Sequence, residues 1–384
     1  MSIRTTAFLL FGIIILSIIL IALFAFAFPA QKRSVTEQFS ACEKSFNDGK
    51  YQEINSLLET FIKKHPRSKK TPDAYYYLAI SKQKLGDTIG AMKLWDRIIK
   101  KYPKSKNIAE AYYYLGYGYE NDKQYDQAME KYKIVIDKLS DAPITAGAIL
   151  GLGRIYETKG QEADAFANYQ NVVDKYPNSE FITEAEHNWG NINLKKFIKE
   201  STKPYVVERG ESLETIASKF RITPQLIMRL NDLKSTAINA GQPLTIIDGL
   251  SFNVLIDLSE RKLYFKSGDK VIKRYGVCVG KPETPTPDGS YNVTEKEVDP
   301  VWFSTAETGG KGEIPGGDPR NELGKRWIGF KPSYGVHGTI FPKSIGKAES
   351  HGCVRMLNEN VMELYDLVSV GTPIKIMTIT RRPK

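Results

Sequence analysis

Cysteine and histidine are scarce in this chain of 384 residues, which has three cysteines and four histidines. Three cysteines do not make a disulfide framework, so with 41% hydrophobic residues the chain is expected to fold around apolar cores. Nucleic-acid-binding motifs are also missing from the sequence. The net charge of +10 comes from 54 basic and 44 acidic residues spread along the chain. This balance suits an anionic cell wall or membrane surface, and no nucleic-acid partner is expected.

Charge is missing from residues 5–31, and residues 7–28 are almost continuously apolar. At 1.5 Å per helical residue, such a run can cross the ~30 Å apolar core of a bilayer. It is longer than the apolar core of a usual signal peptide, although Ala25-Phe26-Ala27 is compatible with cleavage. Residues 1–33 are therefore predicted to be a membrane anchor or, alternatively, a cleaved signal segment.

An internal repeat marks residues 34–200 as the first of the two or three domains that the length predicts. Its period is 37 residues. The boundary pairs are His65-Pro66, Tyr102-Pro103, Leu139-Ser140 and Tyr176-Pro177, and the turn residues are Gly49, Gly86, Lys123 and Gly160. Because proline cannot continue a helix, each of four units is predicted to contain two helices, with the turn residue between them and the boundary pair at the end.

This pattern resembles the tetratricopeptide repeats of bacterial envelope proteins. The resemblance implies an all-α solenoid with a concave surface for an envelope protein partner. Tyrosines are frequent at residues 75–77 and 112–114, where they either contact such a partner or pack between helices. Packing is expected for most of them, because their spacing matches the interior of helix pairs.

Residues 203–248 are predicted to form a small βααβ unit. Its expected elements are a strand at 205–207, a helix 213–220 capped by Ser212, a helix 224–230 capped by Thr223, and a strand 244–247. With Gly210-Glu211-Ser212-Leu213 and Gly241-Gln242-Pro243-Leu244, the unit resembles a LysM module. The resemblance implies binding of N-acetylglucosamine-containing glycans such as peptidoglycan. It places the sugar near Gly210, Glu211, Ser212, Leu213, Ile238 and Asn239. The alternative is a spacer that packs on its neighbour.

Two of the four histidines and one of the three cysteines gather in His337-Gly338-Thr339 and in residues 350–356. A cysteine thiol has a reference pKa of about 8.5 and needs a nearby base, for which histidine is suited. We therefore expect acyl transfer, with Cys353 as the nucleophile and His337 as its base, brought together by two adjoining strands or a strand and a helix end. No Asp or Asn adjoins His337, so the carbonyl of Gly338 is the candidate that orients the imidazole.

Other interpretations of these residues stay open. His337, His351 and Cys353 could bind zinc, although their spacing matches no usual metal motif, and no metal is predicted. Cys42 and Cys278 are expected to be buried apolar residues. A disulfide between Cys278 and Cys353 would silence the site, and the sequence does not exclude it.

The pair of motifs at residues 335–339 and 350–356 resembles the signature of the L,D-transpeptidase catalytic domain, the YkuD-like family, over residues 251–379. Supporting pieces occur in the family's order: a hairpin at 254–258 and 262–265, Thr284 to Gly289, and Asn321 to Gly324. The resemblance implies a mainly β domain without a cofactor. It implies that Cys353 is acylated, that His337 is the base and that the Gly338 carbonyl orients it. Further residues are implied to form the oxyanion hole or to contact substrate: Tyr334, Ser350, His351, Gly352 and Arg355.

For a multidomain chain of this kind, the resemblance implies action on peptidoglycan stem peptides and glycan strands in the bacterial cell envelope. Cys353 would attack the bond between stem residues 3 and 4 and pass the acyl group to an amine. The alternatives are an L,D-carboxypeptidase, with water as acceptor, and a non-catalytic wall-binding scaffold. Residues 7–28 would anchor the chain in the inner membrane, with the remainder outside the cytoplasm, or cleavage would release it. The glycine-rich segment 302–327 is predicted to be a loop that covers the pocket.

Overall fold

A computed structural model describes residues 34–304 and 312–379, and the chain divides into two compact units, residues 1–151 and 152–384. The predicted anchor or signal segment, residues 1–33, lies outside the described residues. So do residues 305–311 of the predicted loop 302–327. The described parts of that segment include Trp302–Ser304 and Gly312–Ile314, which pair as antiparallel strands, so it is not a loop throughout. Among the described helices, none is long and apolar enough to cross a membrane.

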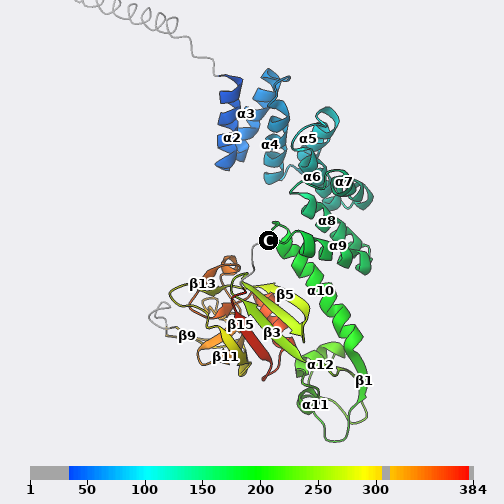
Figure 1. The fold of residues 1–384 in the computed structure, drawn as a ribbon, viewed down its shortest axis with the longest axis vertical. Coiled ribbons are helices and arrows are strands. Elements are labelled where there is room, and N and C mark those ends of the chain that lie inside the picture. The colour runs from blue at the N-terminus through cyan, green and yellow to red at the C-terminus, as the bar shows by residue number, and fades with distance from the viewer. Residues whose placement is uncertain (1–33, 305–311, 380–384) are drawn as a thin grey trace, which may run out of the picture. The chain divides into compact units, whose positions relative to one another are not determined.

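Helix pairs fill the first unit, and their spacing confirms the 37-residue repeat (Figure 1). The first helices of the pairs are α2 (Val35–Asn47), α4 (Thr71–Lys84), α6 (Ile108–Asn121) and α8 (Thr145–Thr158), which continues into the second unit. The second helices are α3 (Tyr51–Lys64), α5 (Thr88–Lys101) and α7 (Tyr125–Lys138). The turn residues are left-handed, with φ of 73° at Gly49, 83° at Gly86 and 58° at Lys123. Lys123 shows that the same turn forms without glycine, at a conformational cost.

Aromatic side chains pack between the helices of this unit. Trp95 of α5 and Tyr132 of α7 are almost fully buried, and Tyr132 donates a hydrogen bond of 2.6 Å to Glu120 of α6. The tyrosines at 75–77 and 112–114 are all buried or half-buried. Most of them therefore contribute to helix packing, as expected.

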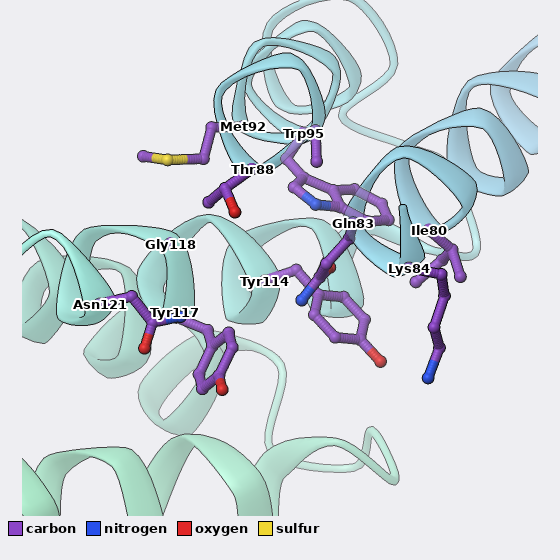
Figure 2. A pocket seen from close by; sticks show the side chains of 11 residues that line it. Ile80, Gln83, Lys84, Thr88, Met92, Trp95, Tyr114, Tyr117, Gly118 and Asn121 are labelled. Carbon is purple, nitrogen blue, oxygen red and sulfur yellow. The ribbon is translucent and has the colours of Figure 1, made fainter. Parts of the chain in front are cut away.

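A cavity of about 370 Å³ lies between α4, α5 and α6 (Figure 2). Trp95 and Tyr114 stack at its wall, with ring centroids 5.2 Å apart. Gln83 also lines it, and the buried side-chain oxygen of Gln83 has no hydrogen-bond partner within residues 34–304 and 312–379. The cavity therefore combines aromatic faces with an unused polar atom.

The second unit begins with the end of the repeat series. Helix α9 (Glu162–Lys175) starts 37 residues after α7, and α10 (Ile182–Ser201) starts 37 residues after α8. Helix α10 is an additional helix that the prediction of four two-helix units did not include. The first strand, β1 (Thr202–Val206), begins directly after α10, so no linker separates the repeats from β1.

The predicted βααβ unit is present. Strand β1 pairs antiparallel with β2 (Pro243–Ile247), and between them lie α11 (Leu213–Phe220) and α12 (Pro224–Leu230). Ser212 caps α11 by accepting from Thr215 N–H, and Thr223 caps α12 by accepting from Leu226 N–H. The first strand begins at Thr202, three residues earlier than expected.

Two sheets build the C-terminal domain. One runs β5 (Lys270–Gly276), β4 (Lys262–Ser267), β3 (Phe252–Asp257), β15 (Pro373–Met377) and β7 (Gly289–Asn292); the other runs β14 (Val354–Arg355), β12 (Tyr334–His337), β11 (Arg326–Lys331) and β8 (Glu295–Val298). Smaller pairs are β6 (Val279–Gly280) with β13 (Ala348–Ser350) and β9 (Trp302–Ser304) with β10 (Gly312–Ile314). The expected opening hairpin is β3–β4. Helix α13 (Asn358–Leu367) packs on β11 and β12.

One hydrophobic core runs from α10 through the βααβ unit into the sheets of the C-terminal domain. Helix α10 also lies along β5, the edge strand of the five-stranded sheet (Figure 1). Asn193 of α10 donates a 2.7 Å hydrogen bond to the carbonyl of Ile272 in β5, and Glu186 pairs with Lys262 at 2.6 Å. Because α10 covers a strand edge, the last repeat helix is a structural part of the C-terminal domain.

Candidate active site

Two parallel strands bring the predicted nucleophile and base to the same region. Strands β12 and β14 pair with Val336 opposite Val354 and His337 opposite Arg355. Cys353 lies in the bend that directly precedes β14. Paired residues on adjoining strands point to the same face, and the strands lie ~4.8 Å apart. His337 and Arg355 therefore share one face of the sheet, and Cys353 adjoins this pair at the start of β14.

His337 is 4% exposed, and its Nδ1 lies 2.6 Å from the carbonyl oxygen of Gly338. A carbonyl can only accept, so Nδ1 carries the proton and Nε2 keeps a lone pair. Burial, followed by the positive charge of Arg355, lowers the pKa of His337 to about 4, against the carbonyls of Gly338 and Leu323, which raise it. The ring is thus neutral at pH 7, as a general base must be.

Cys353 is half-buried, and its thiol donates to the carbonyl of Ser333 at 3.6 Å. Burial raises the pKa of Cys353 above its ordinary value, while the backbone of Gly335 and the charge of Arg355 act in the opposite direction. The thiol is therefore protonated in the resting site. Attack requires proton transfer to a base rather than a thiolate formed in advance.

The turn before Cys353 is shaped by Ser350, which is 1% exposed. Its hydroxyl donates to the Cys353 carbonyl at 2.5 Å and accepts from Gly352 N–H at 3.2 Å. Gly352 has φ of 110°, and a Cβ there would lie 2.7 Å from the Tyr334 ring. His351 is exposed. Since Gly352 N–H is already bonded, Cys353 N–H, which has no partner among the described residues, is the more available oxyanion donor.

Arg355 lies opposite His337 and pairs with Glu322 at 3.4 Å. Its guanidinium also lies 5.7 Å from the centroid of the Phe341 ring. The sequence assigned no role to Glu322, although it belongs to the segment 321–324 that supported the resemblance. Only the fold shows that Glu322 meets Arg355.

Family models match three parts of the chain. Residues 251–376 match the L,D-transpeptidase catalytic domain, residues 205–246 the LysM domain, and residues 31–196 a family described as an outer membrane lipoprotein. A putative L,D-transpeptidase, YkuD, of Bacillus licheniformis is 35% identical over 179 residues, which are 45% of this chain and 97% of the relative. The chain belongs to the L,D-transpeptidase family. It is therefore a cysteine-dependent acyltransferase by family.

Other proteins similar to this L,D-transpeptidase have the same family name. The putative L,D-transpeptidase YkuD of Bacillus subtilis is 32% identical, with 45% of this chain and 97% of the relative covered. Among solved structures, L,D-transpeptidase 3 from Mycobacterium tuberculosis is 21% identical over 36% of this chain and 66% of that chain, with a TM-score of 0.29.

In this L,D-transpeptidase, several predicted glycan-binding residues make contacts inside the LysM module itself. Leu213 is fully buried, and Ser212 caps α11. Glu211 accepts from the Tyr205 hydroxyl at 2.7 Å and pairs with Lys219 at 3.5 Å. Asn239 is exposed, Ile238 is half-buried, and Gly210 has φ of 88°. Asn239 and the Gly210 backbone are thus the predicted positions most accessible to a sugar.

Metal binding finds no geometric support in the described part of this L,D-transpeptidase. No group of three His, Cys, Asp or Glu side chains within residues 34–304 and 312–379 is arranged to hold an ion. His337, His351 and Cys353 do not converge as zinc ligands would. All three cysteines are free, and Cys42 and Cys278 are buried as expected.

Proposed function

We propose that this L,D-transpeptidase cross-links or modifies peptidoglycan through Cys353 and His337. The observation that carries the proposal is the pairing of β12, which ends in the buried His337, with β14, which begins directly after Cys353. The LysM module, which the family match supports as a peptidoglycan-binding domain, would keep glycan strands near the site.

In the first half-reaction, Cys353 Sγ attacks the carbonyl carbon between stem residues 3 and 4, and its proton passes to Nε2 of His337. The tetrahedral oxyanion accepts from Cys353 N–H. The carbon–nitrogen bond then breaks, the thioester forms, and the terminal D-amino acid leaves with the proton returned by His337.

In the second half-reaction, an acceptor amine attacks the thioester carbon and gives a proton to His337. The carbon–sulfur bond breaks, and the proton returns to Sγ. An amine of another stem gives a cross-link, a protein amine attaches that protein, and water gives trimmed stems. Exclusion of water from the pocket decides between these outcomes.

The envelope is the proposed location. The match of residues 31–196 to an outer membrane lipoprotein family supports an envelope protein. The finer proposal is that residues 7–28 anchor the chain in the inner membrane, with the repeats displayed outside the cytoplasm. The cavity lined by Trp95, Tyr114 and Gln83 is the place proposed for an envelope protein partner.

Mass spectrometry tests the proposed reaction. Full-length protein and Cys353→Ala are incubated with a disaccharide-tetrapeptide; the whole chain is used because α10 covers β5. Dimers lacking one terminal D-alanine, absent with the variant, are the expected product. Trimmed monomers alone would assign water as the acceptor. Equal products with and without Cys353 would contradict the proposal and favour the scaffold alternative.

A further inference from the structure

Asn358 is the first residue of α13, and its side chain lies between two loops at the active site. Its Oδ1 accepts from Lys325 N–H at 3.0 Å, and its Nδ2 donates to the Thr339 carbonyl at 3.0 Å. A Cβ on either Gly324 or Gly338 would overlap Oδ1. Glycine at both positions therefore allows the two loop backbones to close around this amide.

The two loops that Asn358 joins hold the base. The Gly338 carbonyl, one residue before Thr339, accepts from His337 Nδ1 at 2.6 Å. The backbone of Leu323, two residues before Lys325, acts on the same ring, because it raises the pKa of His337. One side-chain amide thus links the segment whose carbonyl accepts from His337 Nδ1 to the segment that contains Leu323.

The backbone beside Gly338 is also held by its sheet neighbours, since His337 pairs with Trp327 and its carbonyl accepts from Met356 N–H at 2.8 Å. Gly338 N–H donates to the Arg326 carbonyl at 3.3 Å, a long hydrogen bond. The hydroxyl of Thr339 accepts from Phe341 N–H within its own loop, so it does not tie that loop to residues 323–325. The Asn358 amide therefore adds to these backbone bonds a side-chain link between the two segments on the side of α13.

We propose that Asn358 is a positioning residue for His337. By holding the Thr339 carbonyl, one peptide beyond Gly338, against Lys325 N–H, its amide keeps the Gly338 carbonyl aimed at Nδ1. Nδ1 then holds its proton, and Nε2 stays free to accept the proton of Cys353. The role of His337 in this inference rests on the proposed function, whereas the orientation of the imidazole does not.

The amide suits this position because it both donates and accepts. Alanine removes both bonds. Aspartate keeps the acceptor for Lys325 N–H, but when ionised it places an oxygen against the Thr339 carbonyl. Protonated aspartate can donate again. In the aspartate variant, the bond from Lys325 N–H is kept at every pH, whereas the bond to the Thr339 carbonyl forms only at low pH.

The test uses full-length protein in four forms: wild type, Asn358→Ala, Asn358→Asp and Asn360→Ala. Asn360 is the matched control, since it lies in the same first turn of α13 and its side chain has no hydrogen bond in the described part of the chain. Two readouts are compared, turnover of the disaccharide-tetrapeptide and the Nδ1–H resonance of ¹⁵N-labelled histidine. The four histidines make that spectrum simple.

Asn358→Ala is expected to lower kcat by up to about 10²-fold, the effect of a misplaced catalytic group, with KM changed little. Its Nδ1–H signal should broaden or disappear while the melting temperature stays close to that of wild type. In Asn358→Asp, kcat relative to wild type should rise as the pH falls towards the ordinary carboxyl range of about 4. Asn360→Ala should match wild type in every readout.

An unchanged Nδ1–H signal in both Asn358 variants, or a loss of kcat that only follows the folded fraction, would overturn the positioning role. If Asn358→Ala does not fold, the pH response of Asn358→Asp decides. Absence of Cys353-dependent turnover in the wild type would instead refute the proposed function. The resonance would then still report whether Asn358 orients the imidazole.

Discussion

Cys278 and Cys353 are both close to Arg355, yet their surroundings differ. Cys278 exchanges two backbone hydrogen bonds of 2.9 Å with Arg355, and Cys353 precedes Arg355 by two residues. Cys278 is fully buried beside Val277 and Val279. Cys353 is half-buried and directly precedes β14, the strand that pairs with the His337 strand. Proximity to the site therefore does not make a thiol a nucleophile; access and a base do.

Replacing the proposed nucleophile should cause the largest loss of activity and so the largest difference between the two cysteines. Cys353→Ala is expected to lower kcat/KM by at least about 10⁴-fold, because no other group can form the thioester. The measurement is turnover of disaccharide-tetrapeptide by mass spectrometry. Cys278→Ala serves as the matched control. Equal losses of kcat/KM in both variants would show that activity depends on the packing around Arg355. The distinction between the two thiols would then be wrong.

The base should have the next largest effect. His337→Gln is expected to lower kcat by about 10²–10⁴-fold, the usual contribution of a general base. Because the pKa of His337 is lowered to about 4, wild-type activity should persist well below pH 6 and decline towards pH 4 as the ring gains a proton. A pH–rate profile of the free enzyme measures this. An acid limb near 6.5 would contradict the burial of a neutral imidazole.

Stability gives an independent test of the same imidazole. Unfolding restores the His337 pKa from about 4 to 6.5, so the unfolded chain binds the proton more tightly. Folding stability is therefore lost as the pH falls from about 6.5 to 4, by about 3 kcal/mol at 1.36 kcal/mol per pKa unit. Denaturant unfolding of wild type and His337→Gln across this range should show a shallower decline in the variant. Parallel stability curves for wild type and His337→Gln would contradict a lowered His337 pKa in the folded protein.

Local signals in the sequence predicted much of this molecule. Proline and glycine recurring every 37 residues predicted the helix pairs, and Ser212 and Thr223 predicted two helix starts, because caps and turns depend on neighbouring residues. The motifs also indicated the two segments that pair as β12 and β14. What stayed hidden depends on distant partners. Glu322 meets Arg355 across 33 positions, and nothing local indicates such a contact.

Helix α10 and Asn358 illustrate the same limit. The composition after residue 177 continues the repeat, yet Asn193 of α10 bonds to β5 almost 80 residues later in the chain. A domain boundary at residues 200–203 is natural from sequence, but a continuous core crosses it. Asn358 follows the cysteine motif closely. Its function as a link between two loops became visible only when Lys325 and Thr339 were placed beside it.

Arg355 acts on both members of the pair, so its removal should have a moderate effect. Its charge lowers the pKa of His337 and of Cys353. Arg355→Met should therefore move both limbs of the pH–rate profile to higher pH and reduce kcat near neutrality. Glu322→Gln removes the partner of Arg355 and should move the limbs the opposite way, by less. Limbs that stay fixed in both variants would show that solvent screens this charge.

The smallest effect on activity is expected from Cys278. Cys278→Ala removes a buried sulfur between two valines, which costs about 1 kcal/mol of folding stability through lost packing, while kcat/KM should stay within about twofold of wild type. Iodoacetamide sharpens the contrast: in the folded protein Cys353 should be alkylated, slowly because its thiol is protonated, whereas Cys278 should react only after denaturation. Peptide mass spectrometry distinguishes the two sites. Rapid alkylation of Cys278 in the folded protein would mean that this strand opens readily, and burial would then no longer explain why only one of the two thiols does the chemistry.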